Sequence, residues 1–185
     1  PIFPEFLLTH PVTESRIADA RSQASAYPRK SYPLSLPFQL MRARVRMLLA
    51  ESPVAAETRF RGELKDGRTQ LPPAPRYGLV LALTAQGRHA EARETLAPLL
   101  AEDPDNAAYT LAAIHLMLAE GQATKALEHL EAALKASPGV YPLRRAYATA
   151  LGAAGHHSAA QGVLETLARV RPQDESIWYA LAETA

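Results

Sequence analysis

The side chains best suited to zinc binding and to proton transfer near neutral pH are the six histidines, and the chain contains no cysteine. The histidines are His10, His89, His115, His129, His156 and His157. A zinc peptidase of the common helical type needs two histidines one turn apart and a glutamate as general base, and no pair here has this HExxH spacing. There is also no nucleophile–base pair and no phosphate-binding loop. The sequence therefore predicts that this chain holds no catalytic residues of its own.

Individual histidines leave several interpretations open. His10 lies in the apolar, proline-rich stretch 1–11, where it could bind a metal ion or simply pack under Phe3 and Phe6. His156 and His157 are adjacent, and neighbouring residues of a helix point about 100° apart, so exposed positions in a turn suit them better than one shared metal.

The element that must position these residues is a repeat with a period of 34 residues, in which a glycine, an alanine, a leucine and a proline return three times. The four sets are Gly87, Gly121 and Gly155; Ala92, Ala126 and Ala160; Leu96, Leu130 and Leu164; and Pro104, Pro138 and Pro172. This period and order are typical of the tetratricopeptide repeat, a pair of antiparallel helices. The glycine allows a left-handed turn after the first helix, the alanine lies where the helices cross, and the leucine packs one turn later. The proline ends the second helix.

The repeat predicts an all-α protein, a right-handed superhelix of tetratricopeptide repeats (an α-α solenoid) preceded by a short linker helix and an extended segment. We divide the chain into residues 1–36 (loop, linker helix and extended linker), 37–72 (a degenerate first repeat), 73–106, 107–140 and 141–174 (regular repeats) and 175–185 (the first helix of a further repeat). The proline-rich residues 71–75 are expected to separate the degenerate repeat from the regular array, whose first helix then starts near Arg76.

The degenerate repeat opens with an ambiguous pattern. Met41, Val45, Leu48 and Leu49 form a helical stripe, although apolar residues also alternate with Arg42, Arg44 and Arg46 as in a strand. The helical surroundings favour the helix. The three arginines could suggest nucleic-acid binding, but surface arginines whose stems lie along the protein fit better, because no aromatic residues are interleaved with them.

Composition narrows the classes of partner. The net charge is +1, which gives no electrostatic reason to expect nucleic acid, and no apolar run is long enough to span a membrane. The chain starts at Pro1 without a methionine, so we expect it to be a piece of a longer protein.

The concave groove of such an array is lined by the inner face of each first helix, and this is where we expect binding. The predicted groove residues are Tyr77, Leu81, Thr84, Leu111, His115, Leu118, Arg145 and Thr149. They are mixed apolar and weakly basic, which suits an extended or partly unfolded peptide better than a terminal carboxylate. They could equally be mere groove surface without a ligand.

Three stretches carry a resemblance to a known family: Pro4–Pro11 (PEFLLTHP), Arg16–Arg21 (RIADAR), and Arg76-Tyr77-Gly78 together with Ala90–Leu100 (AEARETLAPLL). With them, nearly the whole chain resembles the C-terminal part of the bacterial periplasmic zinc metalloproteases of the β-barrel assembly-enhancing protease family. Members of that family carry an HExxH domain, then this linker helix and a tetratricopeptide domain, and act in outer-membrane protein quality control. The resemblance implies a periplasmic location, with zinc only in the intact parent.

The resemblance also implies partners and a role for His10. The partners would be a protein or extended peptide in the groove, components of outer-membrane barrel assembly, and the parent's own protease domain. His10 would lie by the zinc site of the intact parent and could occupy its open coordination position. The function predicted for this chain is therefore a protein-interaction and regulatory domain of a zinc-dependent protease. The alternative is a free-standing tetratricopeptide-repeat adaptor with no enzymatic parent; the reading frame upstream of Pro1 distinguishes the two.

Overall fold

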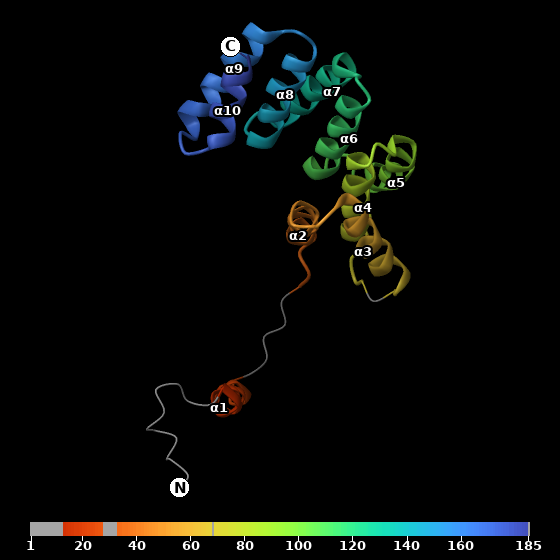
Figure 1. Cartoon of the computed structure of the whole chain (residues 1–185), viewed down its shortest axis with the longest axis vertical. Coiled ribbons are helices and arrows are strands. Elements are labelled where there is room, and N and C mark those ends of the chain that lie inside the picture. The colour runs from red at the N-terminus through yellow and green to blue at the C-terminus, as the bar shows by residue number, and fades with distance from the viewer. Residues whose placement is uncertain (1–12, 28–32, 68, 185) are drawn as a thin grey trace. The chain divides into compact units, whose positions relative to one another are not determined.

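Every regular element in the described residues, 13–27, 33–67 and 69–184 of this computed structural model, is an α-helix (Figure 1). The chain divides into two compact units, residues 1–34 and 35–185. Within the first unit, the structure describes one helix, α1 (Thr13–Ser25). No described helix combines the length and the apolar character that crossing a membrane would require.

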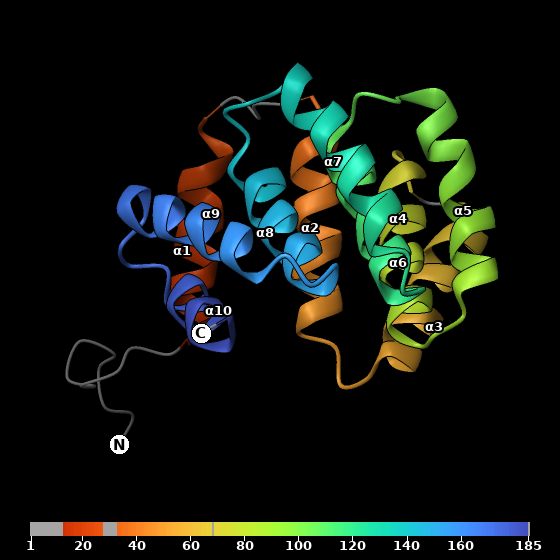
Figure 2. The ribbon, with the colours of Figure 1, turned by 90° about the horizontal axis from the view of Figure 1, so that it is seen from above.

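The second unit contains the remaining helices, which pair as antiparallel hairpins. They are α2 (Leu36–Leu48), α3 (Pro53–Lys65), α4 (Pro73–Ala85), α5 (His89–Glu102), α6 (Ala107–Ala119), α7 (Ala123–Ala136), α8 (Tyr141–Ala153), α9 (His157–Val170) and α10 (Glu175–Thr184). Each helix from α3 onward packs mainly on its neighbours in sequence, whereas α2 packs mainly on α4 (Figures 1 and 2). This stack of helices confirms the all-α solenoid class.

The positions that recur every 34 residues have the conformations expected from their residue types. Gly87, Gly121 and Gly155 have φ angles of 73°, 73° and 82°, which a residue with a Cβ rarely adopts. The alanines of the repeat are fully buried, and the leucines that follow them are at most 3% exposed. The hairpins are therefore closed by a left-handed turn and a small residue at the crossing.

Two helices begin earlier than the sequence predicted. The Ser35 hydroxyl accepts a hydrogen bond from the backbone N–H of Phe38, so α2 starts at Leu36 and the extended linker ends before Pro37. The interpretation of residues 71–75 as a separator was wrong in part, because α4 starts at Pro73 and not near Arg76. Prolines are tolerated there because the first turn of a helix needs no backbone donors.

The buried residues form three clusters along the array, and α6 takes part in two of them. Its residues Tyr109, Ala112 and Leu116 pack in a cluster with α2–α5, whereas Leu111 and Ile114 pack with α7 and α8. A third cluster joins α8, α9 and α10. The core is thus a chain of neighbour contacts, as a repeat array requires.

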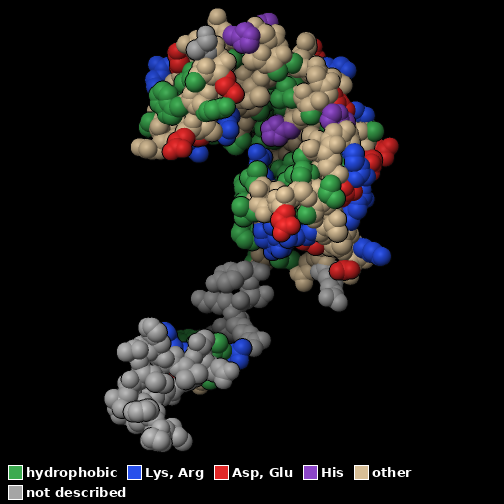
Figure 3. All heavy atoms as spheres, viewed as in Figure 1, with side chains coloured by type: hydrophobic (Ala, Val, Ile, Leu, Met, Phe, Trp, Pro, Cys, Tyr) green, Lys and Arg blue, Asp and Glu red, His purple; other side chains and the backbone are tan. Residues whose placement is uncertain are grey.

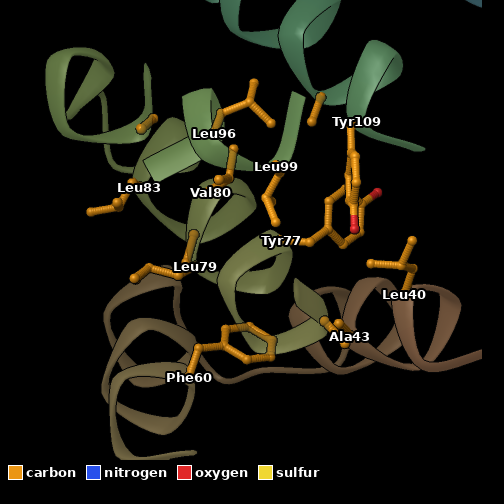
Figure 4. Close-up of a cluster of buried hydrophobic side chains, with 14 of the residues drawn as sticks. Leu40, Ala43, Phe60, Tyr77, Leu79, Val80, Leu83, Leu96, Leu99 and Tyr109 are labelled. Atoms are coloured by element: carbon orange, nitrogen blue, oxygen red, sulfur yellow. The ribbon is translucent and has the colours of Figure 1, made fainter. Parts of the chain in front are cut away.

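The first cluster shows how α2 joins the array (Figure 4). Leu40 and Ala43 are buried and face Tyr77 of α4, whose ring lies 6.1 Å from that of Tyr109. The stripe used to predict this helix lies on its other side, with Met41, Val45, Leu48 and Leu49 all exposed. The helical period was therefore right, but that stripe does not form the core.

The last helix, α10, is not anchored by its aromatic residue. The Trp178 side chain is 52% exposed, and its indole N–H donates to the Pro172 carbonyl at 2.9 Å. The adjacent Ile177 is fully buried instead and anchors α10 in the third cluster.

An ion-pair network links α3 to the turn between α4 and α5. The Glu57 carboxylate accepts hydrogen bonds from Arg61 Nε (2.7 Å), Gln86 Nε2 (2.9 Å) and Arg88 Nη1 (2.7 and 2.8 Å). Hydrogen bonds from Arg61, then from Gln86 and Arg88, lower the pKa of Glu57 to about 2. The carboxylate therefore stays ionised although its residue is buried.

Candidate functional site

A cavity of about 890 Å³ opens within the second unit, where helices distant in sequence face one another. We call it the groove. Its walls come from α2, from Tyr77 of α4, from α6, from α8, and from the turn between α9 and α10. The residues that line the groove include Leu40, Met41, Arg44, Tyr77, Asn106, Leu111, His115, Tyr141, Pro142, Arg145, Thr149, Arg171 and Asp174. In the space-filling view, hydrophobic and basic side chains gather around this hollow (Figure 3).

The structure brings together five of the eight residues predicted to line a groove. Tyr77, Leu111, His115, Arg145 and Thr149 all border the same cavity. Their common position in successive repeats explains this, because each projects from the inner face of its first helix. Tyr77 contributes little open surface, since it is only 2% exposed.

The other three predicted residues do not line the groove. Leu81 packs against the first cluster, because α2 lies on α4 and makes this stretch of its inner face part of the core. Thr84 donates its hydroxyl proton to the Val80 carbonyl, within its own helix. Leu118 packs against the second cluster.

Two arginines of the groove lining, Arg44 and Arg145, act on His115. Burial lowers the pKa of His115 first, and the positive charges of Arg44 and Arg145 lower it further. Arg44 comes from α2 and Arg145 from α8, so two different helices each contribute a positive charge that acts on the His115 imidazole. With its pKa below the usual value, His115 is harder to protonate than a free imidazole.

The groove lining also includes a carboxylate, whose oxygens are already hydrogen-bonded. Asp174 Oδ2 accepts from the Tyr141 hydroxyl at 2.7 Å, and Oδ1 accepts from the backbone N–H of Ser176 at 3.2 Å and from its hydroxyl. The bonds from Ser176 and then Tyr141 lower the pKa of Asp174. The Arg171 guanidinium lies over the Tyr141 ring, 4.2 Å from its centroid, in a cation–π contact.

The sequence reasoning missed the contributions of α2 and of the α9–α10 turn. Arg44 had been interpreted only as a surface arginine, whereas it borders the groove and acts on His115. Asp174 directly precedes α10 and accepts a hydrogen bond from the backbone N–H of Ser176. Aspartate is a preferred residue at this position, so the sequence could have indicated that Asp174 caps a helix. The stacking of Arg171 on Tyr141 had no local signal, because it joins residues 30 apart.

The described part of the chain offers no metal site. No three His, Asp or Glu side chains in residues 13–27, 33–67 and 69–184 converge in a way that could hold an ion. His89 and His157 begin α5 and α9, and His156 and His157 are exposed, as expected for a turn. His10 lies outside the described residues.

Stacked helix hairpins with a lined groove define this chain as a helical-repeat module of the protein-binding type. The family model of the tetratricopeptide repeat matches residues 72–114 and 117–183. The chain belongs to the tetratricopeptide-repeat family. Its fold is also similar to that of a thermophilic tetratricopeptide-repeat protein from Thermus thermophilus, with a TM-score of 0.65 and 22% identity over 81% of each chain.

Sequence similarity extends beyond the repeats to nearly the whole chain. It is 32% identical over 97% of its length to part of the β-barrel assembly-enhancing protease of Escherichia coli (strain K12). It is 29% identical over the same share to that of Yersinia pestis, and 35% identical over 57% to a putative one of Vibrio cholerae. The chain spans 37% of the length of the first two relatives.

Proposed function

We propose that this chain is the protein-interaction and regulatory region of a zinc-dependent protease, and that its groove holds an extended segment of a substrate or partner protein. The observation that carries the proposal is the groove itself, where inner-face residues of successive repeats border one cavity of about 890 Å³. A cleft of this size, with apolar walls and a few polar groups, suits an extended peptide. The similarity to relatives named as proteases supports an enzymatic parent.

The wider setting is part of the same proposal. We propose that the parent carries an HExxH domain that binds zinc, that it acts in the periplasm, and that its partners include components of outer-membrane barrel assembly. The described residues do not offer a ligand set for zinc, so the metal would be bound outside them. The parent's reading frame upstream of Pro1 tests this directly: the absence of an HExxH helix would contradict it.

Filling the groove is expected to weaken peptide binding. Thr149 is exposed and borders the cavity, so Thr149→Trp places an indole in the groove without disturbing the core. The probes are fluorescein-labelled nonapeptides with acetylated and amidated ends, in which Leu, Phe or Tyr alternates with polar residues. We expect their affinity for the chain to fall by about tenfold or more. Fluorescence anisotropy measures this change.

The matched control is Thr166→Trp on α9. Thr166 is also exposed and also donates its hydroxyl proton to the carbonyl four residues earlier, but it does not border the groove. We expect its affinity to match that of the unsubstituted chain. Equal binding by both variants, or no peptide binding at all, would contradict the proposed use of the groove.

The role proposed for His10 is tested in the whole protease. If its imidazole occupies the open coordination position of the zinc, His10→Ala frees that position for water and increases the rate of proteolysis. The measurement is cleavage of an unfolded protein by the full-length enzyme, with His89→Ala as a control because His89 starts a helix of the repeat array. An unchanged rate in His10→Ala would count against the role of His10 and leave the function of the groove unaffected.

A further inference from the structure

We propose that the groove selects extended segments that carry an acidic side chain between apolar residues, and that Arg44 and Arg145 bind its carboxylate. This inference rests on the proposed function of the groove and adds the chemistry of its ligand. Arginine is suited to the role because its guanidinium donates two parallel hydrogen bonds to a carboxylate.

The first observation is that these arginines have no acidic partner among the described residues. Arg46, Arg61, Arg88 and Arg93, which do not line the groove, each form an ion pair with a glutamate. Neither Arg44 nor Arg145 forms one with any carboxylate in the described parts of the chain. Both therefore keep guanidinium donors free for a ligand.

The second observation is that the two charges act at the same place. Arg44 comes from α2 and Arg145 from α8, yet both influence the imidazole of His115 on α6. A carboxylate bound beside His115 is therefore attracted by both arginines at once. The half-buried position of Arg44 and His115 reduces screening by water.

The third observation concerns Asp174, the one carboxylate among the described residues that line the groove. Asp174 offsets only part of the positive charge of the lining, because three arginines border the cavity; Arg145 also lowers the pKa of Asp174, whose oxygens accept from Tyr141 and Ser176. Arg171, the third arginine, is stacked on Tyr141. The lining thus keeps an excess of positive charge that a ligand carboxylate would complement.

The apolar part of the lining sets what flanks the acidic residue. Met41 on α2 and Pro142 on α8 are exposed and border the cavity, whereas Leu40 and Leu111 border it but are only 4% and 7% exposed. A segment with apolar residues on either side of a central Asp or Glu can contact these walls while its carboxylate reaches the arginines.

The test uses two pools of acetylated and amidated, fluorescein-labelled nonapeptides that alternate Leu, Phe or Tyr with Ser. One pool has a central Glu and the other a central Gln, and the blocked ends ensure that only the side chain differs in charge. We expect the Glu pool to bind the chain about tenfold more tightly, and this advantage to shrink as salt is raised. Arg44→Gln and Arg145→Gln should each remove most of the advantage.

Neighbouring arginines provide controls with the same change in charge. Arg42 and Arg144 are exposed and do not border the groove, so Arg42→Gln and Arg144→Gln should keep the preference for Glu. Circular dichroism confirms that all four variants are folded. In an NMR titration, the Glu pool but not the Gln pool should raise the pKa of His115, because a bound carboxylate stabilises the imidazolium.

The outcomes separate this inference from the proposed function. Equal binding of both pools, lost in Thr149→Trp, would overturn the acidic preference and leave the groove as a peptide site. A preference for Glu that falls equally in the control variants would also overturn it, because general surface charge would then account for the effect. Binding of neither pool would contradict the function of the groove as well.

Discussion

Replacing Gly78 with valine is expected to lower the free energy of unfolding by about 3 kcal/mol, since overpacking a filled core costs this much. Gly78 lies in the middle of α4, and a Cβ built on it would lie 2.4 to 2.7 Å from three ring atoms of Phe60. That ring is 1% exposed and belongs to the first buried cluster, so moving it aside would disturb the side chains around it (Figure 4). Urea unfolding followed by circular dichroism measures the change.

Gly62 provides the matched control, because it is also a helical glycine but faces open space. A Cβ at Gly62 meets nothing within 4 Å, so Gly62→Val on α3 should change stability by no more than about 0.5 kcal/mol. Pairing Gly78→Val with Phe60→Leu, which shortens the opposing side chain, should recover part of the loss. Similar effects of valine at both glycines would show that the close packing of Gly78 on Phe60 is not responsible.

Acidification is expected to destabilise the chain as Glu57 takes up a proton. Its pKa is about 2 when folded and 4.5 in the absence of partners, so the folded state favours the ionised form. The resulting stability is fully present above about pH 4.5 and is lost as the pH falls toward 2, because there the unfolded chain binds the proton first. The measurement is the free energy of unfolding between pH 7 and pH 2.

Glu57→Gln should remove this contribution at neutral pH, lowering the free energy of unfolding by about 2 kcal/mol. The amide leaves Arg61 and Arg88 without the carboxylate that joins α3 to the α4–α5 turn. In the variant, the decrease of stability between pH 4.5 and 2 should become shallower. Glu94→Gln is the control, because Glu94 is exposed and hydrogen-bonds to no other described side chain. An identical pH profile for Glu57→Gln and the unsubstituted chain would contradict the role of this network.

The repeat positions could be predicted from sequence because their causes are local. Each helix hairpin needs a glycine with positive φ in its turn, a buried alanine at the helix crossing and a leucine one turn later. These needs arise within one hairpin and recur every 34 residues. Five inner-face residues could be assigned to one groove for the same reason. To assign them, it is enough to know which face of the first helix of each repeat points inward.

The remaining features depend on contacts between elements and could not be read from one hairpin. The packing of α2 on α4 turns Leu81 into a core neighbour and brings Arg44 to the groove, yet the apolar stripe of α2 suggested a different buried face. The stripe is misleading because α2 meets α4 through Leu40 and the small Ala43. Similarly, Asp174 reaches Tyr141 only because α9 returns the chain alongside α8.

Helix α6 packs on two sides and lies between two separate clusters of buried residues. Tyr109 and Leu116 belong to one cluster and Ile114 to the next, so the two clusters share no buried side chain. A rotation of α6 would displace buried side chains of both clusters at once, so the wall that α6 gives to the groove is held in place from two sides.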